Sequence, residues 1–139
     1  MTPHPSRKKD GRPSAAHLVR SRRQLRSEQQ RSRDSYYEFL RIAPMSLGLY
    51  VIRERGIDDQ RPHREDEVYV VLRGKGRVRV GRTDSGVIEG SVIFVPALRP
   101  HHFHSITETL ELLVVFAPAY TRDTSSDRTA SPRRPHRAR

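Results

Sequence analysis

Residues 63–76 combine side chains that bind metal ions with a pattern typical of a buried strand. One imidazole and three carboxylates occur within the first five positions of this stretch. Both groups are common ligands of divalent transition metals. A run of β-branched and aromatic residues follows and ends at two glycines. The metal-capable residues are His63, Glu65, Asp66 and Glu67, and further histidines stand at positions 101, 102 and 104.

A folded core must position these groups, and 139 residues are enough for one domain. The formal net charge of +11 belongs to the two ends of the chain. Residues 1–34 carry ten Lys/Arg against three Asp/Glu, and residues 119–139 carry six against two, whereas residues 35–118 carry eleven of each. We therefore predict a folded domain over residues 35–118 between two basic tails, 1–34 and 119–139.

Short apolar runs separated by glycine and proline predict an all-β domain. Residues 36–42 are expected to form a helical turn that ends before Pro44. The glycines at positions 74 and 76 predict a turn between two strands. Such an element pattern, without a strong helix between the strands, favours an antiparallel sandwich or barrel. The expected strands cover residues 46–53, 67–72, 77–80, 87–89, 92–95, 101–104 and 110–116.

The tails have compositions that favour disorder. Residues 1–13 are rich in proline and basic residues, and residues 14–33 predict one weakly amphipathic helix with Ser14 as its cap. The arginines of this tail could contact phosphates, but no aromatic residue precedes Tyr36 to stack on bases. We therefore expect a solvated basic extension whose nucleic-acid contacts are at most non-specific.

Several classes of protein are excluded by residues that the sequence lacks. It contains no cysteine, which rules out a disulfide scaffold, a thiolate metal site and a cysteine nucleophile. No apolar run approaches the roughly 18 residues of a membrane span, and the N-terminus lacks the apolar segment of a secretory signal. A cytoplasmic location without membrane contact is the expectation.

Two spacings resemble the motifs of the cupin family. Glu67, six residues and Gly74 match the end of the first cupin motif. Gly90, five residues and Pro96, followed by His101 five positions later, match the frame of the second. The segment from about Ser46 to Pro118 is thus similar to a small single-domain cupin. This resemblance implies an antiparallel β-barrel of the jelly-roll, or double-stranded β-helix, type.

The resemblance also implies one divalent metal ion, such as Fe, Mn, Zn or Ni, in the barrel. By position, the ligands would be His63, Glu67 and His101. Arg61 stands where the family usually has a further histidine, and arginine does not ligate metals. Gln60 is an alternative fourth ligand. Otherwise the metal has three protein ligands, or the site is empty of metal and Arg61 binds a substrate carboxylate. Leu98 replaces the usual glycine of the second motif, so a different path is expected for the loop before His101.

Strand alternation predicts which neighbours share the barrel interior. Glu67 and Tyr69 are expected to point inward, as are His101 and Phe103, whereas His102 and His104 point outward. Tyr50, Tyr69 and Phe103 could line a substrate pocket or form plain core. Glu65, Asp66, Glu108 and Glu111 are expected to be solvated charges.

These observations leave two kinds of function open. The first is a metal-dependent enzyme acting on a small polar molecule, either a dioxygenase or an isomerase. The alternative is a non-catalytic barrel that binds or senses a small ligand, with tails that contact nucleic acid non-specifically. Pairing of edge strands in a homodimer is a further option that the resemblance implies, with an exposed edge near residues 46–52.

Overall fold

The computed structural model describes residues 17–121, which form one helix and six strands. The remainder of both predicted tails, residues 1–16 and 122–139, lies outside the described residues. All strand pairs are antiparallel, which confirms the predicted fold class. The elements are α1 (Arg22–Ser32), β1 (Tyr36–Ile42), β2 (Met45–Ile52), β3 (Asp66–Val80), β4 (Thr83–Ile88), β5 (Val92–Val95) and β6 (His101–Ala117).

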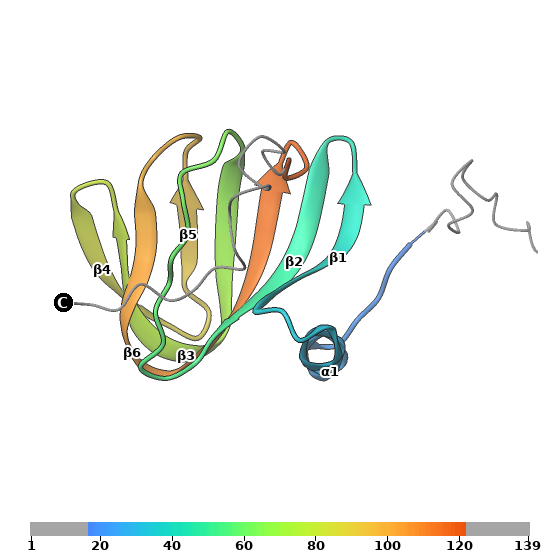
Figure 1. Cartoon of the computed structure of the whole chain (residues 1–139), viewed down its shortest axis with the longest axis horizontal. Coiled ribbons are helices and arrows are strands. Elements are labelled where there is room, and N and C mark those ends of the chain that lie inside the picture. The colour runs from blue at the N-terminus through green and yellow to red at the C-terminus, as the bar shows by residue number, and fades with distance from the viewer. Residues whose placement is uncertain (1–16, 122–139) are drawn as a thin grey trace, which may run out of the picture.

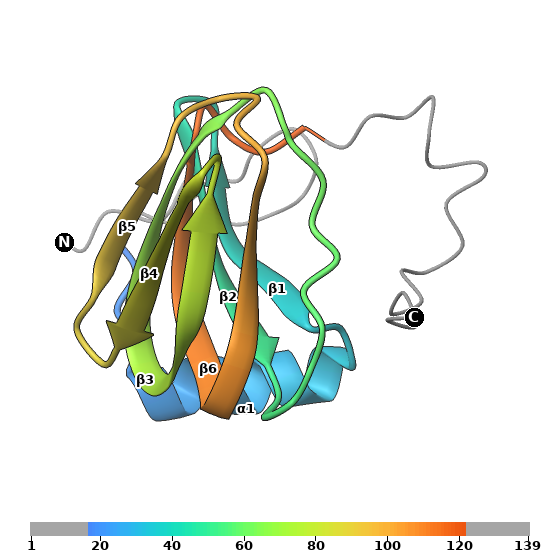
Figure 2. The same cartoon turned by 90° about the vertical axis from the view of Figure 1, so that its left-hand side faces the viewer.

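The strands form one curved sheet in the order β1-β2-β6-β3-β4, with β5 paired to β3. Figure 1 shows β4 and β1 at opposite ends of this sheet. In Figure 2 the strands wrap around a common interior, with β5 on one side and β1 on the other. The interior holds the larger apolar cluster, which includes Tyr50, Tyr69, Phe103, Leu110 and Phe116.

Strand β3 bends where the sequence predicted a turn, so that prediction was wrong. Residues 66–80 form one continuous strand that pairs first with β5 and then with β4. The register against β6 shifts on both sides of Gly74, which has a φ of 105°. A Cβ atom at Gly74 would lie 2.2 Å from the carbonyl oxygen of Thr109. The glycine therefore bends the strand against its neighbour instead of reversing the chain.

Strand β6 is likewise longer than predicted, because residues 101–117 form one strand instead of two. It pairs with β3 along most of its length and with β2 through its second half. The two long strands β3 and β6 are thus the shared centre of the sheet. Both ends of the sheet depend on them for their positions.

Residues 36–42 form strand β1, not the predicted helical turn. They pair antiparallel with β2 through a two-residue connection at Ala43 and Pro44. Aromatic and aliphatic residues suit a half-buried strand as well as a helical turn, and the contact with β2 decides between them. The edge of β2 that was predicted to be exposed is covered by β1, and the homodimer stays a prediction.

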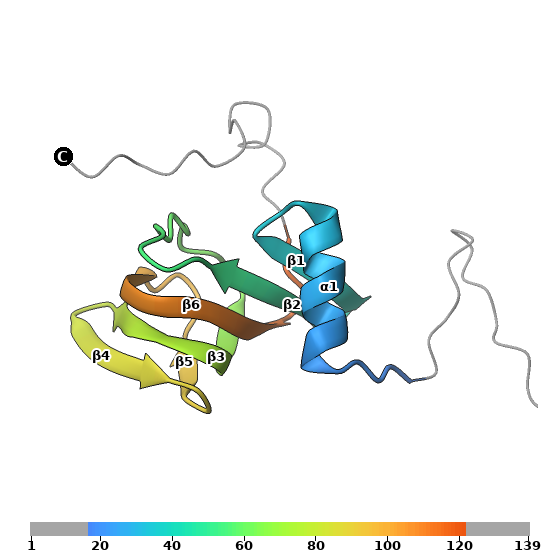
Figure 3. The same ribbon diagram turned by 90° about the horizontal axis from the view of Figure 1, so that it is seen from below.

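Helix α1 packs against the sheet (Figure 3) and begins at Arg22, later than predicted. Ser21 caps it through a reciprocal bond pair with Gln24. Its Leu25 is buried in a second apolar cluster with Leu49 and Val51, on the outer face of β2. None of the helices in the described part of the chain is long and apolar enough to cross a membrane.

Two arginines of α1 also bind a buried carboxylate of the barrel. Arg22 lies 2.8 Å and Arg26 lies 3.2 Å from Glu111, which is 5 % exposed. The prediction of a solvated charge at Glu111 was therefore wrong, because its partners come from a segment far away in the sequence. The division of the chain at residues 34 and 118 stays a prediction, although contacts cross both boundaries.

Candidate metal centre

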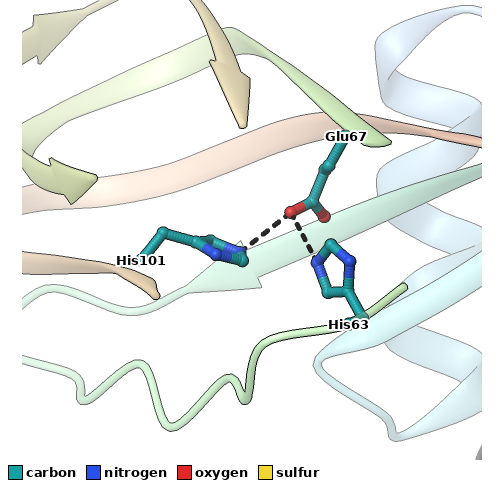
Figure 4. Close-up of side chains that lie close together, drawn as sticks. All are labelled: His63, Glu67 and His101. Atoms are coloured by element: carbon teal, nitrogen blue, oxygen red, sulfur yellow. Dashed lines mark hydrogen bonds and ion pairs between the residues drawn. The ribbon is translucent and has the colours of Figure 1, made fainter. Parts of the chain in front are cut away.

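Three predicted ligands come together inside the barrel (Figure 4). His63 lies in the connection between β2 and β3, Glu67 is the second residue of β3, and His101 begins β6. One ligand atom from each residue lies within 4.8 Å of the other two. The side chains of Glu67 and His101 are fully buried, and that of His63 is 9 % exposed.

The carboxylate of Glu67 lies between the two imidazoles. Its Oε1 is 3.1 Å from His63 Nε2 and 2.9 Å from His101 Nε2. Burial alone would raise the pKa of Glu67, but the neighbouring His101 and His63 bring it below its usual range. Burial opposes protonation of His101, yet the adjacent Glu67 and the Arg99 carbonyl raise the pKa of His101 above its ordinary value. Each group therefore favours the charged form of the other.

Both imidazoles are oriented by backbone carbonyls. His63 Nδ1 lies 3.0 Å from the carbonyl oxygen of Glu65, and His101 Nδ1 lies 2.8 Å from that of Arg99. A carbonyl oxygen only accepts hydrogen bonds, so both Nδ1 atoms must carry the proton. In the neutral rings, both Nε2 atoms then present lone pairs beside Glu67. Metal-binding histidines are usually held in this way.

Two polar atoms at this point have no hydrogen-bond partner within residues 17–121. They are His101 Nε2 and Glu67 Oε2, and both are buried. The 2.9 Å approach of His101 to Glu67 has the length of a hydrogen bond but not its geometry. Buried polar atoms without partners are costly, and a divalent cation between them would satisfy both. Two imidazoles and one carboxylate therefore fit a divalent transition metal.

The loop before His101 is tied to the other histidine. Leu98 has a φ of 65°, a left-handed conformation that favours glycine, at the position where the second motif usually has glycine. Its backbone N–H donates to the carbonyl of His63 at 2.7 Å. The segments that carry the two histidines are thus joined directly. His102 is exposed and Phe103 is buried, as strand alternation predicts.

Gln60 takes part in a buried polar network, and its role as a fourth ligand stays a prediction. Its Oε1 accepts a hydrogen bond from the Tyr69 hydroxyl at 2.7 Å, and its Nε2 donates to Asp58 at 3.0 Å. Asp58 also accepts from the Tyr50 hydroxyl and from the backbone N–H of Phe103. The sequence reasoning missed Asp58, because a polar connection gives no sign that one of its carboxylates is buried.

The four residues predicted to contact substrate separate into two groups. Tyr50, Tyr69 and Phe103 are buried together, and the rings of Tyr69 and Phe103 meet edge to face with centroids 4.9 Å apart. Arg61 is exposed. Contact of these residues with a substrate stays a prediction. The hydroxyl of Tyr36, which was not predicted, is buried and has no hydrogen-bond partner in the described part of the chain. Burial, then the charges of Glu38 and Glu67, raise the pKa of Tyr36.

Glu65 is buried, which corrects the prediction that it faces solvent. It is 2 % exposed, and its Oε1 accepts hydrogen bonds from the N–H and the hydroxyl of Thr121. Burial alone would raise the pKa of Glu65, but the bonds from Thr121 lower it below its usual value. Asp66 is exposed, as predicted, and accepts a bond from the N–H of Ala97.

Comparisons with known proteins agree with this geometry. The cupin domain family model matches residues 49–116. An uncharacterised protein of Streptomyces coelicolor is 43 % identical over 95 residues, which cover 68 % of this chain and 90 % of that protein. Solved structures of two further bacterial proteins are similar in fold. TT1209 from Thermus thermophilus has a TM-score of 0.54 and 29 % identity, and the match covers 61 % of this chain and 83 % of TT1209. BH2720 from Bacillus halodurans has a TM-score of 0.62 and 20 % identity, and the match covers 78 % of this chain and 85 % of BH2720.

The motif spacings, the antiparallel barrel and the His-Glu-His cluster thus agree with the match to the cupin domain model. The protein belongs to the cupin domain family.

Proposed function

We propose that this protein binds one divalent transition metal ion through His63, Glu67 and His101, and that the metal centre holds a small polar molecule in the barrel. One observation supports the proposal above the others. Both Nδ1 atoms are bound to carbonyl oxygens, so both Nε2 atoms are available to a metal beside a buried carboxylate. Iron, manganese, zinc and nickel all accept this donor set.

The residues around the cluster would shape its chemistry. A bound metal would supply Lewis-acid polarisation or oxygen activation, as a dioxygenase or an isomerase requires. Glu67 would neutralise part of the metal charge, and its burial strengthens that interaction. The rings of Phe116 and Tyr69 lie beside the histidines and restrict the access of water. The small exposed fraction of the cluster limits the partner to a small molecule.

The same burial favours a second candidate, a barrel that binds or senses a ligand without turnover. Two of the three ligand side chains are fully buried, so exchange of substrate and product would require local movement. Both candidates share the metal centre. Addition of small carboxylates such as oxalate to the metal-loaded protein would show binding as a rise in melting temperature, and chemical analysis of the mixture would show turnover.

Metal analysis after reconstitution tests the shared part of the proposal. The wild type and His102→Ala should each hold about one equivalent, whereas His101→Ala should hold less than about a tenth. His102 is the matched control because it is the exposed neighbour of the ligand. A wild type that takes up less than about a tenth of an equivalent, or a His101→Ala variant with unchanged occupancy, would contradict the metal site.

A further inference from the structure

Glu65 lies beside the proposed ligand His63, on the side of the ring that faces away from Glu67. Its Oε2 is 3.7 Å from His63 Nδ1, the same nitrogen that lies 3.0 Å from the backbone carbonyl of Glu65. This Oε2 is buried and has no hydrogen-bond partner among the described residues. The other oxygen, Oε1, accepts two bonds from Thr121, at 2.8 Å and 2.7 Å.

A buried carboxylate is costly unless its oxygens are paired. Thr121 satisfies Oε1, and Oε2 lies 3.7 Å from Nδ1 of His63, which carries a proton. A metal on Nε2 would withdraw electron density from the ring and make this N–H a stronger donor. Carboxylates placed behind metal-binding histidines fix the orientation of the ring in this way.

Thr121 is itself held in place by the segment of residues 118–121, which crosses the β1–β2 hairpin. The N–H of Ala119 donates to the carbonyl of Ala43, and that of Tyr120 donates to the hydroxyl of Ser46. The ring of Tyr120 packs on Phe116 with centroids 4.8 Å apart and lies 6.1 Å from the ring of His63. This segment therefore covers His63 and fixes the position of Thr121.

We propose that Glu65 is a positioning residue for His63. Thr121 holds Glu65 in place, and in this way segment 118–121 becomes part of the metal centre. The inference rests on the proposed metal binding, but it concerns a residue outside the ligand set. His63 has this carboxylate beside its Nδ1 in addition to a backbone carbonyl, whereas the Nδ1 of His101 lies next to the carbonyl of Arg99. The two histidines can therefore be perturbed separately.

Substitutions at both ends of this contact test the inference. Glu65→Gln keeps the shape of the side chain but leaves one acceptor oxygen, so Thr121 and His63 can no longer both face a carboxylate oxygen. We expect the dissociation constant for Zn²⁺, measured by competition with a chelator, to rise about 10- to 100-fold. Thr121→Val should raise the dissociation constant severalfold, whereas Thr121→Ser, which keeps the hydroxyl, should leave it near the wild-type value. Asp66→Asn, at the exposed neighbouring carboxylate, should leave it unchanged.

A second measurement separates positioning from general destabilisation. In the metal-free protein, nitrogen NMR of the imidazoles reports which ring nitrogen carries the proton. Glu65→Gln should weaken the preference of His63 for the tautomer protonated at Nδ1, because only the backbone carbonyl of residue 65 then favours it, and should leave the tautomer of His101 unchanged. Unchanged zinc affinity and an unchanged His63 tautomer in a folded Glu65→Gln variant would overturn the inference. If Glu65→Gln fails to fold, Thr121→Val decides by the same two criteria.

Failure of the proposed function would be visible separately. If the wild type binds no metal, the metal centre is refuted. The tautomer of His63 in the metal-free variants would still support or overturn the positioning role of Glu65.

Discussion

Substitution of Gly74 by alanine should destabilise the barrel far more than the same change at Gly90. Both glycines have a positive φ, of 105° and 87°. They differ in surroundings, because a Cβ at Gly74 would lie 2.2 Å from a backbone oxygen, whereas a Cβ at Gly90 would meet nothing within 4 Å. Gly90→Ala is therefore a matched control that contains the backbone strain without the overlap.

The size of the difference follows from these two contributions. Alanine in such a conformation costs about 1–3 kcal/mol at either position. Overlap with Thr109 adds about 1–3 kcal/mol at Gly74, since the atom in contact belongs to the backbone of β6 and cannot rotate away. We expect the free energy of unfolding to fall by about 2–6 kcal/mol in Gly74→Ala and by about 1–3 kcal/mol in Gly90→Ala. The total free energy of unfolding of a domain of this kind is about 5–15 kcal/mol.

Equilibrium unfolding of the metal-free variants in urea, followed by circular dichroism, measures both values. Equal losses of stability at the two positions would refute the reasoning. That result would mean that β3 and β6 separate at the bend without loss of packing. The register shifts beside Gly74 would then have no energetic importance.

Two further predictions concern the helix and the buried network. Leu25→Ala should lower the free energy of unfolding by about 2–4 kcal/mol, because Leu25 is buried against β2. Val19→Ala, at an exposed position, should change it by less than about 0.5 kcal/mol. Equal effects of the two substitutions in urea unfolding would show that α1 does not pack as described. Burial raises the pKa of Asp58, although its hydrogen bonds oppose the shift. The folded protein therefore holds the Asp58 proton more tightly than the unfolded chain does. Stability should fall as the pH rises from about 4 through the pKa of Asp58 in the folded protein. Relative to Asp58→Asn, the metal-free wild type should therefore lose stability over that interval, and a constant difference between the two would contradict the raised pKa.

The barrel and its candidate site could be predicted from the sequence because both have short-range signatures. Alternation along β3 and β6 places Glu67 and His101 inside, and the resemblance to the cupin motifs implies that the two residues share one site. The bend at Gly74 could not be predicted, since a glycine pair signals a turn as readily as a bulge. The choice depends on contact with β6.

The buried carboxylates could not be predicted for a related reason. Glu65 and Glu111 look like surface charges in their local sequence. Their partners are Thr121 and Arg22, which lie 56 and 89 residues away. Charges are rarely buried without partners, so burial could be inferred only after the partners were placed.

The partners of both carboxylates also lie outside the segment that the family model matches. A shortened version that keeps residues 35–118 would contain all six strands but would lack Arg22, Arg26 and Thr121. Glu111 would then lose both arginines, and Glu65 would lose both hydrogen bonds to its Oε1. We therefore expect a version that runs from Ser21 to Thr121 to be more stable than one limited to residues 35–118.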